Sequence, residues 1–266
     1  MKSKLNPYRD DIIDRYCNQR QGLKTISKYY HCDKKTLKNF LVKNGIKIRE
    51  LNHVPYSFDE GYFDCINSSN KAYILGMLYA DGANVKQYNA VKLSLASEDR
   101  AILEKIREEM KVEKPLLFYE RSKRNSKWKD VYELKIYSKH ICEQLEILGC
   151  TPRKSLTLTF PNFLSDDLMP HFIRGYFDGD GCICISKSHI ISSFVSSTDF
   201  CIGLHNYLQK IGIACKLCTL KTNEHTSRII ISKKSEIKKL MNYMYKDADL
   251  YMDRKHNTFL NIFGAN

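Results

Sequence analysis

Two stretches of the chain decide its fold: YILGMLYADG at residues 73–82 and FIRGYFDGDG at residues 172–181. Each contains an aromatic residue, an Ile, a Gly, a second small residue and a final Asp-Gly, and Asp81 and Asp180 lie 99 positions apart. One Asp-Gly is a common turn dipeptide. Two copies in register indicate that this part of the chain is a duplication.

The segments after the two Asp-Gly pairs are predicted to repeat one order of elements: two strands, a helix, two strands and a helix. In the first copy we expect them near residues 83–87, 90–96, 99–110, 116–120, 131–137 and 139–148. In the second copy we expect them near residues 182–187, 190–196, 199–211, 214–221, 227–232 and 234–245. Lys154 follows Asp81 by 73 positions, and Lys255 follows Asp180 by 75. We therefore predict an α+β fold of two pseudo-symmetric αββαββα repeats, residues 69–161 and 162–266.

Small residues mark one face of the helix that ends at each Asp-Gly. Gly76 and Ala80 are four apart, as are Gly175 and Gly179, so each pair lies on one helical face. Small side chains at this spacing allow two helix backbones to approach closely. We predict that the two helices pack together and bring Asp81 and Asp180 to one place.

That arrangement conflicts with simple electrostatics. A carboxylate at the C-terminal end of a helix meets the negative end of the helix dipole, which costs about 0.3–1 kcal/mol at an exposed position. Two neighbouring carboxylates also repel each other. A divalent cation would remove the conflict, and Mg²⁺ (or Mn²⁺) is expected because it prefers carboxylate and phosphate oxygens. Asp81 and Asp180 are the predicted metal ligands.

Composition indicates a packed protein with an anionic partner. Of 266 residues, 43% are hydrophobic and 27% are charged, and 43 Lys and Arg against 30 Asp and Glu leave a net charge of +13. The chain has no apolar run of about 18 residues and no export signal at its start, so we expect no membrane span, a cytoplasmic or nucleoid location and reduced cysteines. Residues 1–50 carry 13 basic and five acidic side chains.

These basic residues coincide with a helix-turn-helix pattern. Ile12, Ile13 and Tyr16 have helical spacing, Asp33 is a predicted N-cap, and Asn44-Gly45 a predicted helix end. We predict a helix-turn-helix DNA-binding domain over residues 1–50 and a linker over 51–68, a segment that could also pack against the repeats. The residues expected nearest DNA are Lys34, Lys35, Thr36 and Lys38. A three-helix bundle with a solvated basic face, or one that binds a protein, is the alternative.

Alternation along the predicted strands separates an apolar face from a polar face. In the strand expected at 131–137, one face carries Tyr132, Leu134 and Ile136. The other face carries Glu133, Lys135 and Tyr137. The basic segment 121–129 could follow a DNA backbone or reach base edges, or could simply be solvated. From the strands and this segment, the predicted DNA contacts are Lys92, Arg121, Lys123, Arg124, Lys127, Lys135 and Arg228.

ILGMLYADG and IRGYFDGDG resemble the two copies of the LAGLIDADG motif of homing endonucleases, and residues 70–263 resemble the single-chain, two-repeat form. The resemblance implies a saddle of two antiparallel sheets over the major groove. It also implies that Asp81 and Asp180 are metal-binding catalytic acids, and that Lys154 and Lys255 lie near the scissile phosphates. Tyr79 stands where the motif has its first Asp, which Asp178 keeps. Arg174 leaves the hydrophobic pattern and is expected to face outward.

The resemblance implies a Mg²⁺-dependent, site-specific double-strand DNA endonuclease of the kind associated with intron mobility. It would act as a monomer with internal pseudo-twofold symmetry on an asymmetric target. Three alternatives remain open. The scaffold could serve a catalytically silent DNA-binding regulator or an intron RNA maturase. The chain could instead be a helix-turn-helix regulator whose body senses a ligand or binds a partner.

Overall fold

The computed structural model describes residues 4–19, 21–48, 56–185, 189–220 and 223–264. The chain divides into two compact units, residues 1–55 and residues 56–266, which we call the N-terminal unit and the body. None of the helices in the described part of the chain is long and apolar enough to cross a bilayer.

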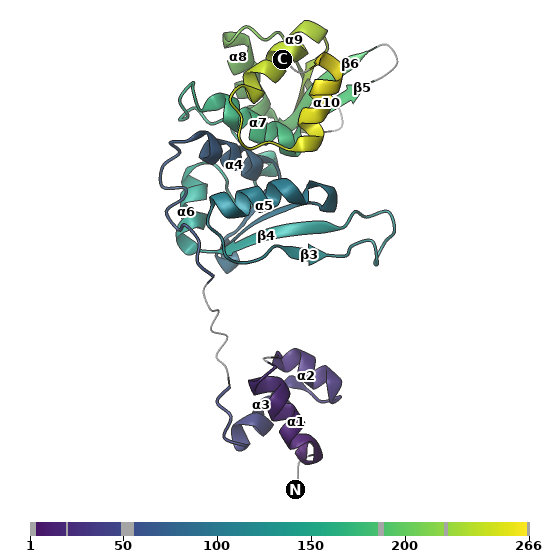
Figure 1. Cartoon of the computed structure of the whole chain (residues 1–266). Helices are drawn as coiled ribbons and strands as arrows, with labels where there is room; N and C mark the ends of the chain where they lie inside the picture. Colours follow the sequence, from purple (N-terminus) through teal and green to yellow (C-terminus); the bar gives the residue numbers. More distant parts are fainter. Residues whose placement is uncertain (1–3, 20, 49–55, 186–188, 221–222, 265–266) are drawn as a thin grey trace. The chain divides into compact units, whose positions relative to one another are not determined.

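The N-terminal unit consists of three short α-helices, and its core comes from the apolar face of each (Figure 1). They are α1 (Arg9–Cys17), α2 (Leu23–Tyr29) and α3 (Lys34–Lys43), after a 3₁₀ turn η1 (Asn6–Tyr8). Ile12, Ile26 and Leu37 are fully buried between them. The spacing of Ile12 and Tyr16 therefore predicted the buried face of α1 correctly, since both side chains are buried.

Helix α3 begins and ends where the sequence predicts. The side chain of Asp33 accepts hydrogen bonds from the backbone N–H groups of Lys35 (2.8 Å) and Thr36 (2.9 Å). These two donors would otherwise have no partner in the first turn. After α3, Gly45 has a φ of +76°, the left-handed conformation that commonly ends a helix. Both predicted caps are confirmed.

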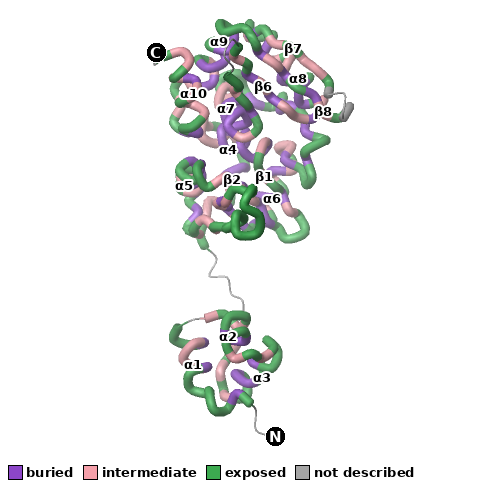
Figure 2. Tube along the Cα trace, turned by 90° about the vertical axis from the view of Figure 1, so that its right-hand side faces the viewer, coloured by how far each residue is buried: buried purple, intermediate pink, exposed green. Residues whose placement is uncertain are grey.

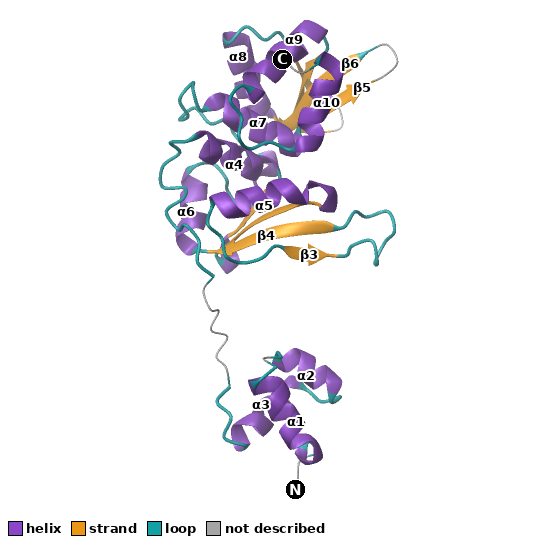
Figure 3. Ribbon diagram, viewed as in Figure 1, coloured by secondary structure: helices purple, strands orange, loops and turns teal. Residues whose placement is uncertain are grey.

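The body contains two copies of one arrangement (Figure 3). The first consists of α4 (Ser69–Ala80), β1 (Gly82–Val85), β2 (Ala90–Ala96), α5 (Arg100–Glu109), β3 (Leu117–Tyr119), β4 (Val131–Tyr137) and α6 (Lys139–Ile147). The second consists of α7 (Met169–Asp180), β5 (Cys182–Ile185), β6 (Ile190–Ser197), α8 (Thr198–Lys210), β7 (Lys216–Leu220), β8 (Asn223–Ile231) and α9 (Lys234–Tyr245). Short 3₁₀ turns are η2 (Lys86–Tyr88), η3 (Ser97–Asp99) and η4 (Lys154–Leu156), and the last helix is α10 (Asp253–Phe263).

Each copy forms a four-stranded antiparallel sheet, with the orders β1-β2-β4-β3 and β5-β6-β8-β7. The predicted alternation in the first sheet is confirmed, because Leu93 pairs with Leu134 on the buried face and Lys92 pairs with Lys135 on the other. Helices cover the buried face of each sheet, and the burial pattern leaves the opposite face more open (Figure 2). The α+β fold of two matching repeats is therefore confirmed.

Helices α4 and α7 join the two repeats, and they pack side by side more extensively than any other pair of helices (Figure 1). A Cβ added to Gly76 would lie 2.2 Å from the carbonyl oxygen of Phe172. A Cβ added to Gly175 would lie 2.0 Å from the carbonyl oxygen of Tyr73. Each helix thus places a glycine against a backbone carbonyl of the other, and neither contact leaves room for a side chain.

The expectation that Arg174 faces outward is wrong. Its side chain is fully buried, its Nε donates to the carbonyl of Leu250 (2.8 Å) and its Nη1 donates to the carbonyl of Met244 (2.6 Å). Helix α7 is covered by α4 on one side and α9 on another, so no face of it is left for a solvated arginine. Arg174 instead binds carbonyls at the end of α9 and in the segment that leads to α10.

The substitution Gly175→Ala tests the packing of α4 against α7. The added methyl group would collide with backbone that cannot move aside, and overpacking of this kind costs about 1–3 kcal/mol or more. Part of that cost is offset by the better helix propensity of Ala, about 1 kcal/mol. We expect the free energy of unfolding of the body to fall by about 2 kcal/mol in urea denaturation.

The control is Gly22→Ala in the N-terminal unit, where an added Cβ meets nothing within 4 Å. It should leave the unfolding of the body unchanged. If Gly175→Ala left the body as stable as it is in the natural protein, that result would contradict the close contact of the two helices.

Candidate active site at the seam between the repeats

Asp81 and Asp180 lie at the C-terminal ends of α4 and α7, where the two helices meet. Asp180 is the last residue of α7, and Asp81 directly follows α4. A Cβ added to Gly179 would lie 2.3 Å from the Cβ of Ala80 and 2.9 Å from Oδ2 of Asp81. The four small residues predicted to line the helix contact therefore lie at the seam, and Asp81 reaches across it to α7.

The environment of the two aspartates disfavours their charged forms. Both residues reach solvent, but the surrounding protein displaces much of their water, and this raises the pKa of each carboxyl. For Asp81 the negative charge of Asp180 adds to the effect, and the pKa rises to about 6. The charges of Lys154 and Lys255 act in the opposite direction on both carboxyls. Two mutually repelling carboxylates therefore face solvent at one place.

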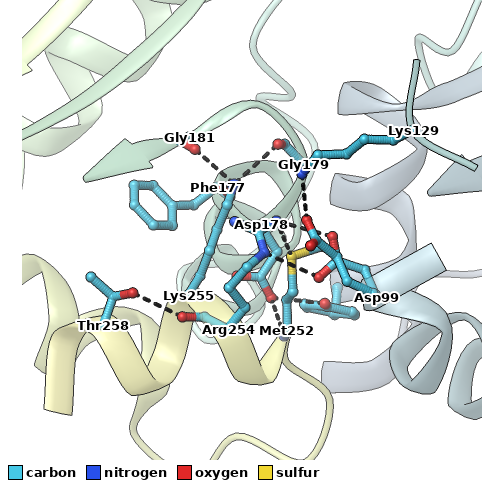
Figure 4. A network of polar contacts seen from close by, with 12 residues as sticks. Asp99, Lys129, Phe177, Asp178, Gly179, Gly181, Met252, Arg254, Lys255 and Thr258 are labelled. Carbon is cyan, nitrogen blue, oxygen red and sulfur yellow. Dashed lines mark hydrogen bonds and ion pairs between the residues drawn. The ribbon is translucent and has the colours of Figure 1, made fainter. Parts of the chain in front are cut away.

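Lys154 and Lys255 are bound to the ends of these helices. The Nζ of Lys154 donates to the carbonyls of Ala80 (3.1 Å) and Gly82 (2.8 Å). The Nζ of Lys255 donates to the carbonyls of Phe177 (2.6 Å), Gly179 (3.0 Å) and Gly181 (2.7 Å), as Figure 4 shows. A cation is favourable at the negative end of a helix dipole. The lysines thus offset the unfavourable placement of the aspartates, and burial lowers the pKa of Lys255 to about 8.

Asp178, the motif position to which we assigned no chemistry, holds the second repeat together. Its fully buried carboxylate accepts hydrogen bonds from the hydroxyls of Tyr73 (2.8 Å) and Tyr245 (3.1 Å) and from the N–H of Met252 (2.7 Å). The bond to Met252 fixes the start of α10, which carries Lys255. In the first repeat, the hydroxyl of Tyr79 donates to the carbonyl of Leu148 at the end of α6.

One ion pair near the seam was not predicted from the sequence. Arg254 binds Asp99 through two hydrogen bonds, from Nε to Oδ1 (3.2 Å) and from Nη2 to Oδ2 (3.0 Å), and Figure 4 shows both. Asp99 is buried and lies in the first repeat, 155 positions before Arg254. No local pattern marks such a contact, because it depends on how the two repeats pack.

The predicted DNA contacts of the body lie on the open sheet faces and on the loop between β3 and β4. Lys92 and Lys135 are cross-strand neighbours in the first sheet, and Arg228 is exposed on β8. The four predicted loop residues, Arg121, Lys123, Arg124 and Lys127, are all exposed. Glu133 is an acid on the same face as Lys135, and it accepts hydrogen bonds from Ser94 Oγ (3.1 Å) and Tyr119 Oη (3.2 Å).

The predicted contacts of the N-terminal unit cluster at the start of α3. Lys34, Lys35, Thr36 and Lys38 are all exposed. The Thr36 hydroxyl donates to Asp33 (2.5 Å), so this side chain is partly used in capping the helix. Lys34, Lys35 and Lys38 are exposed and take no part in this capping.

Comparison with known proteins identifies the fold of the body. Residues 167–244 match the family model of a LAGLIDADG-like domain. The chain is 24% identical over 210 residues to the DNA-directed RNA polymerase subunit Rpo1C of Methanocaldococcus jannaschii. The match covers 74% of this chain but only 22% of that much longer protein.

Among solved structures, the chain is similar to the I-LtrWI LAGLIDADG homing endonuclease bound to target DNA. The TM-score is 0.50 at 14% identity, over 76% of this chain and 89% of that one. The full-length DUF199/WhiA protein from Thermatoga maritima gives a TM-score of 0.49 at 14% identity, over 77% of this chain and 63% of that one. Residues 167–244 therefore match a LAGLIDADG-like domain, and the body shares the fold of a LAGLIDADG homing endonuclease.

Proposed function

We propose that the protein is a metal-dependent endonuclease that cuts both strands of a DNA duplex at a specific, asymmetric site. The observation that carries this proposal is the meeting of Asp81 and Asp180 at the ends of α4 and α7, each beside a lysine bound to the same helix end. The two repeats supply one such helix end each, so each end would serve one of the two strands of a duplex.

The residues at the seam fit a divalent cation such as Mg²⁺ or Mn²⁺. Among the described residues, no group of three or more His, Cys, Asp and Glu side chains could hold a metal ion by itself. Mg²⁺ does not need such a group, because it commonly binds through one or two carboxylates and completes its shell with water and substrate phosphates. Asp81 and Asp180 would be those carboxylates, and the cation would relieve the repulsion between them.

A bound cation would supply an activated water and would stabilise the charge that develops on the leaving oxygen in hydrolysis of a phosphodiester. The protein's own part is to hold two carboxylates at the seam and to balance them with Lys154 and Lys255. Because each ammonium group is fixed by two or three carbonyls, it offers a positive charge without movement at the moment of reaction. This supports a role for both lysines in stabilising phosphate charge.

The rest of the protein would bind the duplex. The open sheet faces carry Lys92, Lys135 and Arg228, and the basic loop adds exposed cations beside them. The unlike side chains of the two sheets favour an asymmetric target. The N-terminal unit would extend the footprint through the first two turns of α3, where Lys34, Lys35 and Lys38 are exposed.

The substitutions Asp81→Asn and Asp180→Asn, made one at a time, test the catalytic site. We expect each to reduce cutting of at least one strand by about a hundredfold or more, which is typical for loss of a group that stabilises transition-state charge. Binding should change little, because no phosphate-binding cation is lost. A plasmid library with random inserts, incubated with Mg²⁺, provides the substrate, and sequencing of the linearised products gives the cut site.

The matched control is Asp199→Asn, which removes the same charge from an exposed position in the first turn of α8. It should cut as the natural protein does. Unchanged cutting by both seam variants would refute the active site. Tight DNA binding without any cutting would instead favour a silent regulator, and preference for intron RNA would favour a maturase.

Replacing Lys34, Lys35 and Lys38 together by Gln tests the role of the N-terminal unit. Each phosphate neutralised by a protein cation contributes about −0.9 to the slope of log binding constant against log salt concentration. We expect the triple variant to bind more weakly and its slope to shrink by up to about 2.7. Titrations at several salt concentrations measure both, and cutting by the body should persist.

Lys43→Gln, at the opposite end of α3, serves as the control and should change the slope little. A triple variant with the affinity and slope of the natural protein would show that the N-terminal half of α3 does not contact DNA.

A further inference from the structure

The two ends of the seam carry the same Arg-Lys pair but hold the arginine differently. Arg153 precedes Lys154, and Arg254 precedes Lys255. Arg254 is bound to Asp99 by two hydrogen bonds, and Figure 4 shows this pair beside Lys255. The Asp99 side chain is only 7% exposed, whereas that of Arg254 is 51% exposed. The guanidinium is therefore fixed along one edge and open to solvent along the other.

The opposite end lacks this ion pair. Asp99 is the residue directly before α5, and the residue directly before the matching helix α8 is Ser197. Ser197 is uncharged, and its hydroxyl donates to the carbonyl of Leu158 and accepts from the N–H of Phe200 (3.2 Å). Arg153 is exposed, and within the described part of the chain no carboxylate forms an ion pair with it. The two repeats thus differ at this position, where the first has a charged residue and the second an uncharged one.

This difference matters for a phosphate. A guanidinium binds a phosphate best through two parallel N–H donors, and it does so as a full positive charge. Arg153 can offer all its donors. Arg254 already gives Nε and Nη2 to Asp99, whose negative charge also offsets its own and repels an approaching phosphate.

We propose that Asp99 makes the two ends of the seam unequal, so that the strand whose phosphate lies at Arg153 is held more tightly and cut first. This inference rests on the proposed nuclease function, because it assumes that each end acts on one strand. Asp99 is then a positioning residue that acts through Arg254. A duplex nicked in one defined strand should accumulate before both strands are cut.

Single-turnover kinetics with each strand labelled separately test the inference. For the natural protein we expect one strand to be cut about ten times faster than the other. Asp99→Asn should accelerate the slower strand and reduce the ratio to about threefold or less, because Arg254 is released to the phosphate. A general defect in folding would slow both strands alike and leave the ratio unchanged.

Glu98→Gln is the matched control. Glu98 is the neighbour of Asp99, and its substitution removes the same charge. It takes no N–H donor of Arg254 away from a phosphate, because its hydrogen bond is with the exposed Lys129 (2.7 Å) and its effect on Arg254 is through charge alone. This variant should keep the strand ratio of the natural protein. A ratio that falls as far as with Asp99→Asn would attribute the effect to overall charge and overturn the inference.

Arg153→Met provides a second route if Asp99→Asn does not fold. Its side chain is exposed, so folding should be retained. We expect the faster strand to slow about tenfold and the strand preference to disappear, with little change in the slower strand. An unchanged preference would overturn the inference.

Binding without a divalent cation gives a readout that does not depend on cutting. An uncharged methylphosphonate is placed at one cut position or the other. The substitution should weaken binding of the natural protein several-fold more at the position near Arg153, and Asp99→Asn should make the two losses similar. Equal losses of affinity at the two positions in the natural protein, or equal rates of cutting of the two strands, would refute the inference about unequal ends but not the nuclease function. Failure to cut any duplex refutes the nuclease and this inference with it.

Discussion

Main-chain atoms of α4 and α7 meet without a side chain between them at Gly76 and Gly175, and this contact determines where everything else can lie. The approach is close because each glycine faces a carbonyl of the other helix, that of Phe172 or Tyr73. A methyl group at either position would separate the helices, since packed interiors have no room to absorb it. The contact ends at Ala80 and Gly179, so the next residues along both helices, Asp81 and Asp180, are brought together by packing rather than by attraction.

Packing of this kind imposes an electrostatic cost that the body offsets with buried cations. Two carboxylates at the negative ends of two parallel-running dipoles repel both the dipoles and each other. Lys154 and Lys255, which lie near the end of each repeat, offset this repulsion because their ammonium groups bind the carbonyls of the same helix ends. Asp178 and Arg174 then hold the segment that leads to Lys255. The buried polar contacts of Asp178 and Arg174 therefore help to place one ammonium group.

The duplication made the larger features predictable from the sequence. A motif that occurs twice in register specifies two equivalent helices, and alternation along strands such as Val131–Tyr137 specifies which face is buried. The contacts that were not predicted join polar residues that are far apart in the sequence. Arg174 was expected to face outward because nothing in the local sequence reveals that α9 covers it. Asp99 was expected to begin a helix, and no partner was predicted for it. Such side chains meet their partners only when distant parts of the chain pack together. The spacing of residues within one repeat therefore does not predict these contacts.

These unpredicted contacts are also where the two repeats differ. The helices, the sheet orders and the lysines match between the repeats. In contrast, the position of Asp178 in the second repeat corresponds to Tyr79 in the first, and the position of Asp99 in the first corresponds to Ser197 in the second. Under the proposed function, a symmetric backbone suits the two antiparallel strands of a DNA duplex, because their phosphates are related by a twofold axis. The polar side chains are under no such requirement once both halves belong to one chain. A duplicated protein can therefore keep the geometry of its seam while the charges around each end diverge, and the Arg254–Asp99 pair is the clearest divergence close to the aspartates.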